Sequence, residues 1–336
     1  MTQTDDLRHM AHALHLARRG LGNVWPNPAV GCVIVRGGRV VGRGWTQPGG
    51  RPHAERMALD WAGTLARGAI AYVTLEPCAH YGRTPPCANG LIEAGIARVV
   101  SAMTDPDPRV AGRGHQILRD AGIVVTEGVR ESEAHHLQAG FLSRIQRGRP
   151  FVTLKLATSF DGRIATASGE SQWITGPAAR LHVHAMRMAH DAVMVGGNTA
   201  RVDRPSLNVR GLTTPRQPVR IVLTSRPLPD LPPEGPMHGP LWRIDATPAD
   251  ALAQLADHGI TRVFCEGGGG LAASLLAAGL VDHIIGYTAG VALGGDGLSA
   301  VAPMRLDRLA DAPRFALMET RRIGADLFHR WRRIEG

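Results

Sequence analysis

The sequence has few cysteines, few aromatic residues and no long apolar run, and each shortage excludes a class of protein. Four cysteines in 336 residues are too few for a disulfide framework, which favours a reducing compartment. No uninterrupted apolar stretch approaches the roughly 18 residues of a membrane-spanning helix. The first six residues are acidic and lack the apolar core of a signal peptide. We therefore expect a cytoplasmic protein with no membrane partner.

Basic residues are in excess, but they are scattered along the chain. The formal net charge of +9 would suit nucleic acid, an anionic membrane or phosphorylated metabolites. There is no long Lys/Arg block, and the aromatic residues that stack on bases make up only 4% of the chain. The charge therefore favours small anions, and we expect no nucleic-acid partner. The sequence leaves open whether the chain forms a homo-oligomer.

The length and the patterning predict two α/β domains. A chain of 336 residues is long enough for two separate cores. Alternating strand and helix patterns, with no internal repeat, are typical of α/β layer folds. A polar linker at residues 147–150 is followed by a new apolar strand from Phe151. We therefore expect domains at residues 1–148 and 149–336.

Residues 53–87 carry a candidate metal site. His53, Cys78 and Cys87 form the ligand set of a catalytic zinc, which has three protein ligands and a fourth position open to water. Glu55 is not needed as a ligand and could move protons to and from that water. The alternative is a surface histidine and two core cysteines. The four groups in this order, with prolines beside both cysteines, favour the metal.

The expected local structure supports the same interpretation. Residues 71–75 read as a buried strand, so that Cys78 follows a strand end. Pro85 and Pro86 precede an expected helix at 87–94, whose N-terminus would stabilise the Cys87 thiolate. The H-x-E … P-C order is typical of zinc deaminases, in which an activated water attacks an amino-bearing ring carbon.

The run Thr74–Cys78, followed by His80, Gly82 and residues 84–87, resembles the deaminase half of the bifunctional riboflavin-biosynthesis deaminase/reductases. Eight residues separate the two cysteines, whereas most zinc deaminases have two. The resemblance implies a cytidine-deaminase-like three-layer domain. It also implies hydrolytic deamination of 2,5-diamino-6-(5-phosphoribosylamino)pyrimidin-4-one.

Four further positions in the first half bear on the substrate. Asn27 lies in a Pro-Asn-Pro turn, where it could simply form the turn, and the resemblance places it at the pyrimidine edge. Asp107 stands where the family usually has Asn, and an acid is a poor neighbour for a phosphate. Arg83 and Arg109 are better phosphate candidates, unless they only face solvent.

The second half resembles the reductase half of the same family in residues 151–165 and 169–175. The resemblance implies a dihydrofolate-reductase-like α/β domain that reduces the ribosyl chain to ribityl with NADPH. Lys155 and Asp161 belong to the motif without an assigned role. Arg204 replaces the family's acid or Asn and either faces water or adds a phosphate contact. The implied cofactor contacts are Ala157, Trp173, Thr199, Asp203, Ser225, Gly268, Gly269 and Gly270, and the implied substrate contacts are Ser171, Arg187, Leu207, Arg210 and Glu266.

Two strand ends in this half are candidate cofactor contacts. A strand, a glycine turn and a helix over 262–278 suit a pyrophosphate, although they could form a simple tight turn. Ser225 and Arg226 follow a strand at 219–223 and offer a hydroxyl and a guanidinium to the adenosine 2′-phosphate. The resemblance supports Ser225, and Arg226 is inferred from its charge. Alternatively, both residues only begin the Pro-rich stretch 227–240, which we expect to be mobile or variable.

The remaining patterns give the expected elements. Cys32 and Cys265 are expected in the core, and three histidines in the first helix (His9, His12, His15) are expected to be solvated rather than to bind metal. We expect helices at 4–20 (capped by Thr4), 110–121, within 127–148, and at 177–190, 248–257 and 271–278. We expect a loop at 201–207. Two hairpins are expected, one pairing 30–35 with 40–45 and the other pairing 315–319 with 326–331.

Two other functions remain compatible with these patterns. One is a nucleic-acid base deaminase with a C-terminal binding domain, which the long cysteine spacing and scattered charge disfavour. The other is a deaminase whose second half is only a structural or dimerising module.

Overall fold

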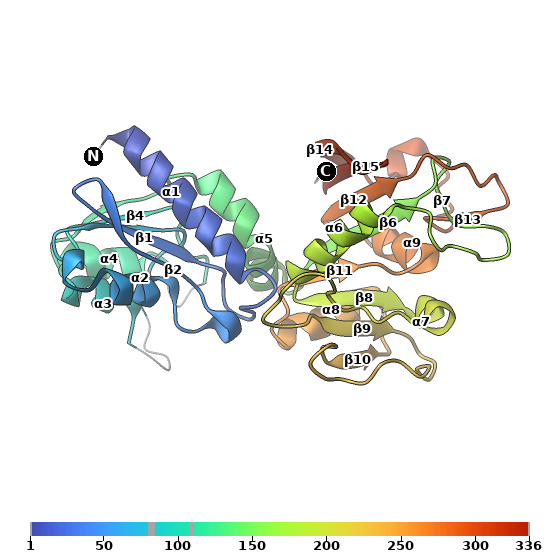
Figure 1. Ribbon diagram of the computed structural model, residues 1–336, viewed down its shortest axis with the longest axis horizontal. Coiled ribbons are helices and arrows are strands. Elements are labelled where there is room, and N and C mark those ends of the chain that lie inside the picture. Colours follow the sequence, from blue (N-terminus) through green and yellow to red (C-terminus); the bar gives the residue numbers. More distant parts are fainter. Residues whose placement is uncertain (1, 80–84, 108–110, 335–336) are drawn as a thin grey trace. The chain divides into compact units, whose positions relative to one another are not determined.

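The computed structural model describes residues 2–79, 85–107 and 111–334. The chain divides into two compact units, Met1–Gly148 and Arg149–Gly336, each with its own sheet (Figure 1). Arg83 and Arg109, together with the motif positions His80 and Gly82, lie outside the described residues. Within the described ranges, no helix is both long and apolar enough to cross a bilayer.

The sheet of the N-terminal unit has five strands in the order β2-β1-β3-β4-β5. Strand β1 runs antiparallel to both of its neighbours, and β3, β4 and β5 run parallel. The strand bounds are β1 Gly31–Arg36, β2 Arg39–Trp45, β3 Ile70–Val73, β4 Arg98–Ser101 and β5 Val124–Thr126.

Helices cover both faces of this sheet. Helices α1 (Gln3–Ala17) and α5 (Glu131–Arg147) lie on one face, and α2 (Ala54–Ala62), α3 (Cys87–Glu93) and α4 (Arg113–Asp120) lie on the other (Figure 1). This is the expected three-layer, cytidine-deaminase-like arrangement.

The helices approach this sheet closely. A Cβ on Gly31 would lie 2.0 Å from the Ala13 carbonyl oxygen of α1, and one on Gly42 would lie 2.2 Å from the Ala58 oxygen of α2. Glycine at these strand positions therefore lets both layers pack against the sheet.

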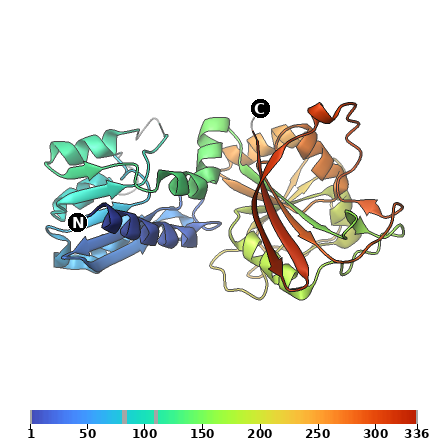
Figure 2. The same ribbon diagram turned by 90° about the horizontal axis from the view of Figure 1, so that it is seen from above.

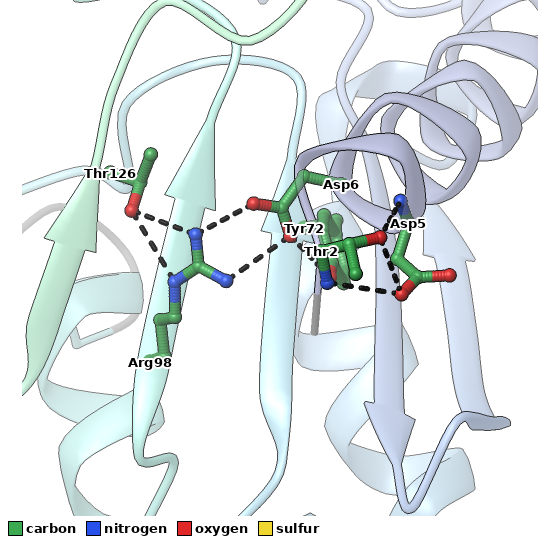
Figure 3. Close-up of polar contacts among 6 residues, drawn as sticks. All are labelled: Thr2, Asp5, Asp6, Tyr72, Arg98 and Thr126. Atoms are coloured by element: carbon green, nitrogen blue, oxygen red, sulfur yellow. Dashed lines mark hydrogen bonds and ion pairs between the residues drawn. The ribbon is translucent and has the colours of Figure 1, made fainter.

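A buried ion pair ties α1 to three strands (Figure 3). Asp6, only 6% exposed, accepts hydrogen bonds of 3.1 and 2.7 Å from Arg98 and one of 2.8 Å from the Tyr72 hydroxyl. Arg98 also donates to the Thr126 hydroxyl at 3.0 Å. Because each charge is paired and hydrogen-bonded, the network offsets the cost of burying it.

The sheet of the C-terminal unit has eight strands in the order β10-β9-β8-β11-β6-β12-β15-β14. The first six run parallel, and the long β14–β15 hairpin, drawn in red in Figure 2, closes one edge. The bounds are β6 Phe151–Thr158, β8 Ala192–Gly196, β9 Val219–Leu223, β10 Leu241–Ile244, β11 Arg262–Cys265, β12 His283–Thr288, β14 Phe315–Ile323 and β15 Asp326–Arg333.

Among the described residues of this unit, four α-helices, a short 3₁₀ helix (Leu309–Asp311) and a small ribbon accompany the sheet. The ribbon pairs β7 (Arg163–Ala165) with β13 (Leu298–Ser299), outside the main sheet. The helices are α6 Pro177–Met188, α7 Gly197–Asp203, α8 Pro248–Asp257 and α9 Gly269–Ala277.

The first helix differs from its expectation at the cap and in its histidines. It is capped by Thr2 rather than Thr4, because the Thr2 side chain accepts from the Asp5 N–H while the Asp5 carboxylate accepts from Thr2. His9 is buried and its ring packs against Tyr72, so the expectation of three solvated histidines holds fully only for exposed His15.

Other elements also differ. Helix α2 was not expected, and part of the loop expected at 201–207 belongs to helix α7. The Pro-rich stretch, whose mobility stays a prediction, makes tertiary contacts: the buried Arg220 donates to the Pro232 and Gly239 carbonyls at 2.7 and 2.8 Å, and Asn208 donates to that of Met237. The sequence signal missed these tertiary contacts because the partners are far apart in the chain.

Candidate metal centre and ligand cavity

The structure brings His53, Cys78 and Cys87 together. Their ligand atoms all lie within 4.8 Å of one another. His53 Nδ1 is 3.3 Å from Cys87 Sγ and 3.8 Å from Cys78 Sγ. His53 caps α2, Cys78 follows the end of β3 and Cys87 is the first residue of α3. Two helix N-termini and a strand end therefore supply the three groups.

The electrostatics of the two cysteines suit a cation. The Cys87 backbone N–H donates to Cys78 Sγ at 3.2 Å. The pKa of Cys78 is lowered to about 4, chiefly by its hydrogen bond with the Cys87 thiol and also by His53. The same bond, together with burial, raises the pKa of Cys87. One imidazole and two sulfurs, with one thiolate already favoured, fit a zinc ion.

Glu55 lies in the first turn of α2 beside this cluster. Its side chain is 4% exposed and hydrogen-bonds the Cys87 thiol. Burial, with the charge on Cys78 as a further cause, raises the pKa of Glu55 to about 7. A carboxyl group with this pKa can both take and give a proton near neutral pH.

Asn27 belongs to the loop that leads to the first ligand. It is half-buried and donates to the Val24 carbonyl at 3.4 Å. A Cβ on Gly50 would lie 1.9 Å from its Nδ2 atom, so Asn27 packs directly on Gly50, three residues before His53.

The C-terminal unit contains a cavity of about 1100 Å³ at the carboxyl ends of its parallel strands. Open α/β sheets hold their ligands at this edge. Of the expected contacts in this unit, all but Ser225 line the cavity. Ser225 and Arg226 are exposed residues that follow β9. The lining includes Ala157, Ser171, Trp173, Arg187, Thr199, Asp203, Leu207, Arg210, Glu266, Gly268, Gly269 and Gly270.

The glycine turn forms one wall of this cavity. Helix α9 begins at Gly269, two residues earlier than expected, so Gly269 and Gly270 belong to its first turn. The Gly268 N–H donates to the Thr199 hydroxyl at 3.0 Å. A Cβ on Gly267 would lie 2.9 Å from the Gly196 nitrogen, so glycine is needed where the ends of β8 and β11 meet.

A buried ion pair lines the same cavity. Arg187 Nε and Nη2 donate to the two Glu266 oxygens at 2.5 and 3.0 Å, and Nη1 donates to the Asn208 carbonyl at 2.7 Å. Burial is the largest single effect and would raise the pKa of Glu266. The charge and hydrogen bonds of Arg187, together with the charges of Lys155 and His184, lower the pKa overall. Lys155, the single lysine of the chain, also lines the cavity. Burial lowers the pKa of Lys155, and the charge of Glu266 opposes that shift.

Sequence reasoning left two features of this cavity unassigned. His184 lines it, and His184 Nδ1 lies 3.2 Å from the Arg210 backbone nitrogen. Asp161 accepts from the Leu293 and Gly294 N–H groups and thereby fixes the loop before β13, whose Leu298 and Ser299 also line the cavity. The only sequence signal was the position of Asp161 in the strand–loop motif, because its partners are more than 130 residues away.

A three-layer α/β unit with a His-Cys-Cys centre and a buried carboxylate defines a zinc-dependent deaminase of the cytidine-deaminase class. A largely parallel sheet with a glycine-walled cavity at its carboxyl edge is an arrangement in which α/β proteins bind dinucleotides. Residues 3–103 match the "cytidine and deoxycytidylate deaminase zinc-binding region", and residues 150–329 match the "RibD C-terminal domain". The chain belongs to the RibD family of bifunctional riboflavin-biosynthesis enzymes, whose deaminase domain binds zinc and whose reductase domain depends on NADPH.

Known relatives match the chain over nearly its whole length. It is 43% identical to riboflavin biosynthesis protein RibD of Haemophilus influenzae, covering 96% of each chain, and 43% identical to that of Escherichia coli, covering 96% of this chain and 98% of the relative. The structure of Acinetobacter baumannii RibD (form 1) matches with a TM-score of 0.90 at 39% identity, over 99% of this chain and 100% of that one. A Thermotoga maritima structure, titled a diaminohydroxyphosphoribosylaminopyrimidine deaminase/5-amino-6-(5-phosphoribosylamino)uracil reductase, matches with a TM-score of 0.88 at 34% identity, with the same coverage. The two rival functions are thereby set aside.

Proposed function

We propose that residues 1–148 deaminate 2,5-diamino-6-(5-phosphoribosylamino)pyrimidin-4-one and that residues 149–336 then reduce its ribosyl chain to ribityl with NADPH. The observation that carries the first activity is the convergence of His53, Cys78 and Cys87 beside the buried carboxyl of Glu55. The Thermotoga maritima relative, whose title names both steps, supports the substrate assignment.

In the deaminase site, His53, Cys78 and Cys87 would hold the metal. A zinc ion bound there acts as a Lewis acid that makes water nucleophilic near neutral pH. Glu55 takes a proton from that water and delivers it to the departing ammonia. Asn27 holds the pyrimidine edge, because a half-buried amide can both donate and accept hydrogen bonds.

In the reductase site, the cavity holds both NADPH and the deaminated pyrimidine. NADPH supplies the hydride, so the protein needs no nucleophile of its own. The N-terminus of α9 would bind the pyrophosphate through the N–H groups of Gly269 and Gly270, with Gly268 beside them. The remaining cofactor contacts are Ala157, Trp173, Thr199, Asp203 and Ser225.

The substrate occupies the basic side of this cavity. Arg210 supplies charge for the phosphate, and Arg187, fixed by Glu266, presents its remaining N–H groups. Ser171 and Leu207 complete the substrate wall. Arg204 also lines the cavity, so its guanidinium can add a phosphate contact.

We infer a cytoplasmic enzyme that acts on a phosphorylated small molecule and has no nucleic-acid partner. All four cysteines are free, as expected in a reducing compartment. Cys32 and Cys265 are fully buried core residues. Whether the enzyme forms a homo-oligomer stays open.

The test separates the two activities in one chain. The substrate is added with and without NADPH, and ammonia release and NADPH consumption are followed separately. Cys87→Ser should lose its metal and its ammonia release, but should still oxidise NADPH when it receives deaminated substrate. Cys32→Ala, which removes a buried sulfur outside the ligand cluster, should keep the metal. Loss of both activities in a folded Cys87→Ser variant would contradict two independent sites.

A further inference from the structure

Glu76 lies two residues before the metal ligand Cys78 and is 3% exposed. Its carboxylate accepts hydrogen bonds from four backbone N–H groups of a segment 29 to 39 residues away. Oε2 accepts from Asp105 at 3.1 Å and from Gly112 at 2.9 Å. Oε1 accepts from Gly114 at 2.8 Å and from His115 at 3.4 Å. This concentration of donors on one buried carboxylate calls for a physical reason.

The donors explain why a charge is tolerated at this buried position. Gly112 is the N-cap of α4, and Gly114 and His115 belong to its first turn. Backbone N–H groups at a helix N-terminus have no partner within the helix, and the helix dipole favours an anion there. Glu76 satisfies three of these groups and also the N–H of Asp105, which follows β4.

The same residue lies next to the metal centre. A Cβ on Gly114 would lie 1.9 Å from the Pro77 carbonyl oxygen, so the first turn of α4 packs directly on the peptide that precedes Cys78. The Glu76 N–H donates to Met103 at 2.9 Å, and the Cys78 carbonyl accepts from Ala88 in α3 at 3.3 Å. Residues 76–78 are therefore held by the segment that follows β4, by the first turn of α4 and by α3.

We propose that Glu76 is a positioning residue of the deaminase: by anchoring α4 and the Asp105 turn to the end of β3, it sets the position of the Cys78 sulfur relative to the other ligands. The proposal rests on the ligand set His53, Cys78 and Cys87 given above. Glutamine at position 76 would keep one carbonyl oxygen, but its NH₂ group cannot accept. Two of the four hydrogen bonds would therefore be lost.

The experiment uses the full-length chain loaded with Co²⁺, whose absorption spectrum reports thiolate ligation and geometry. Glu76→Gln should shift the cobalt spectrum and speed metal release to a chelator by roughly 10- to 100-fold, the usual effect of removing a group that orients a metal ligand. Deaminase kcat should fall more than KM rises. Gly114→Ala, which forces α4 away from Pro77, should shift the spectrum in the same way without removing the carboxylate.

The control is Asp6→Asn. Asp6 is a comparably buried carboxylate of the same unit, 6% exposed, but it binds Arg98 at the amino end of β4 (Figure 3). Glu76, by contrast, follows the carboxyl end of β3. Asp6→Asn should lower the unfolding temperature and leave the cobalt spectrum and the release rate unchanged. Glu76→Asp keeps the charge, so its metal-release rate should lie between those of the wild type and Glu76→Gln. If Glu76→Gln does not fold, Glu76→Asp is compared with Asp6→Asn in its place.

The outcomes distinguish a failure of the role of Glu76 from a failure of the ligand set. If Glu76→Gln loses stability as Asp6→Asn does but keeps the wild-type spectrum, release rate and kcat, Glu76 is only structural and the proposal is wrong. If the wild-type chain shows no thiolate-to-cobalt absorption, the ligand set itself is wrong and the proposal falls with it. A cooperative thermal unfolding transition of the N-terminal unit reports that each variant is folded there, and reductase activity on deaminated substrate reports only on the C-terminal unit.

Discussion

Replacing Glu266 by glutamine tests the ion pair in the reductase cavity. The side chains of Arg187 and Glu266 are 11% and 9% exposed, and two hydrogen bonds of 2.5 and 3.0 Å join them. Removing the charge of one partner leaves the other charge buried and only partly paired. We therefore expect Glu266→Gln to cost both stability and reductase activity.

The size of the effect follows from burial. Breaking a buried pair by removing one partner costs about 3–5 kcal/mol. Glutamine keeps the shape and one acceptor, so the lower end, about 3 kcal/mol, is expected. A domain of this size loses about 2–4 °C per kcal/mol, which predicts an unfolding temperature lower by roughly 6–12 °C. The loss of Arg187 orientation, at about 1.5–3 kcal/mol for a charged hydrogen bond, predicts a ten- to hundredfold lower kcat/KM.

The pair also has a defined pH dependence. Burial would raise the pKa of Glu266, but Arg187, with smaller contributions from Lys155 and His184, brings it below its ordinary value of 4.5. A carboxyl group with a depressed pKa stabilises the folded state fully above the unfolded pKa, and this stabilisation is lost as the pH falls through the folded pKa. Glu266→Gln should therefore flatten the dependence of the unfolding temperature on pH below about 4.5.

The assay is scanning calorimetry combined with NADPH oxidation on deaminated substrate. Arg187→Gln, Glu266→Gln and the double variant form a cycle, in which a coupling energy of about 0.5–3 kcal/mol is expected. Asp282→Asn is the matched control, because Arg149 and Asp282 form a similarly buried pair of 2.7 Å in the same unit and neither lines the cavity. Asp282→Asn should lower stability and keep kcat/KM. Additive single losses in the cycle, or an unchanged kcat/KM in Glu266→Gln, would refute the reasoning.

Two further predictions concern the proton shuttle and the cofactor. Glu55→Gln should keep one zinc per chain and lower the deamination rate by at least ~10²-fold, the usual range for general acid–base catalysis; near-normal turnover would remove Glu55 from the mechanism. Ser225→Ala and Arg226→Ala should each lower kcat/KM roughly ten- to a hundredfold for NADPH and little for NADH, because a hydrogen bond to the charged 2′-phosphate is worth about 1.5–3 kcal/mol. Equal losses with both cofactors would mean that Ser225 and Arg226 do not recognise the 2′-phosphate. The next candidates would then be Arg201 and Arg204, of which Arg204 lines the cavity.

The sequence alone was enough to predict the candidate functional residues where these lie in short runs beside residues, such as proline, that restrict the backbone. His53, Glu55, Cys78 and Cys87 could be named together because the order and spacing of metal ligands are visible in the chain and the prolines beside the cysteines restrict the backbone. Most strands and long helices followed from periodicity for the same local reason. The cap at Thr4 was wrong because a capping box depends on which residue has an acid three positions further on, and Thr2 with Asp5 meets that condition.

Tertiary structure alone decided which distant groups meet. The Arg187–Glu266 pair joins residues 79 positions apart, and the donors to Glu76 come from 29 to 39 residues away. Burial decided the protonation chemistry, since the raised pKa of Glu55 arises chiefly from its loss of contact with water. The spacing of residues in the sequence does not reveal how close two elements lie in space or from which groups packing excludes water. Hydrogen bonds and charge interactions depend on both.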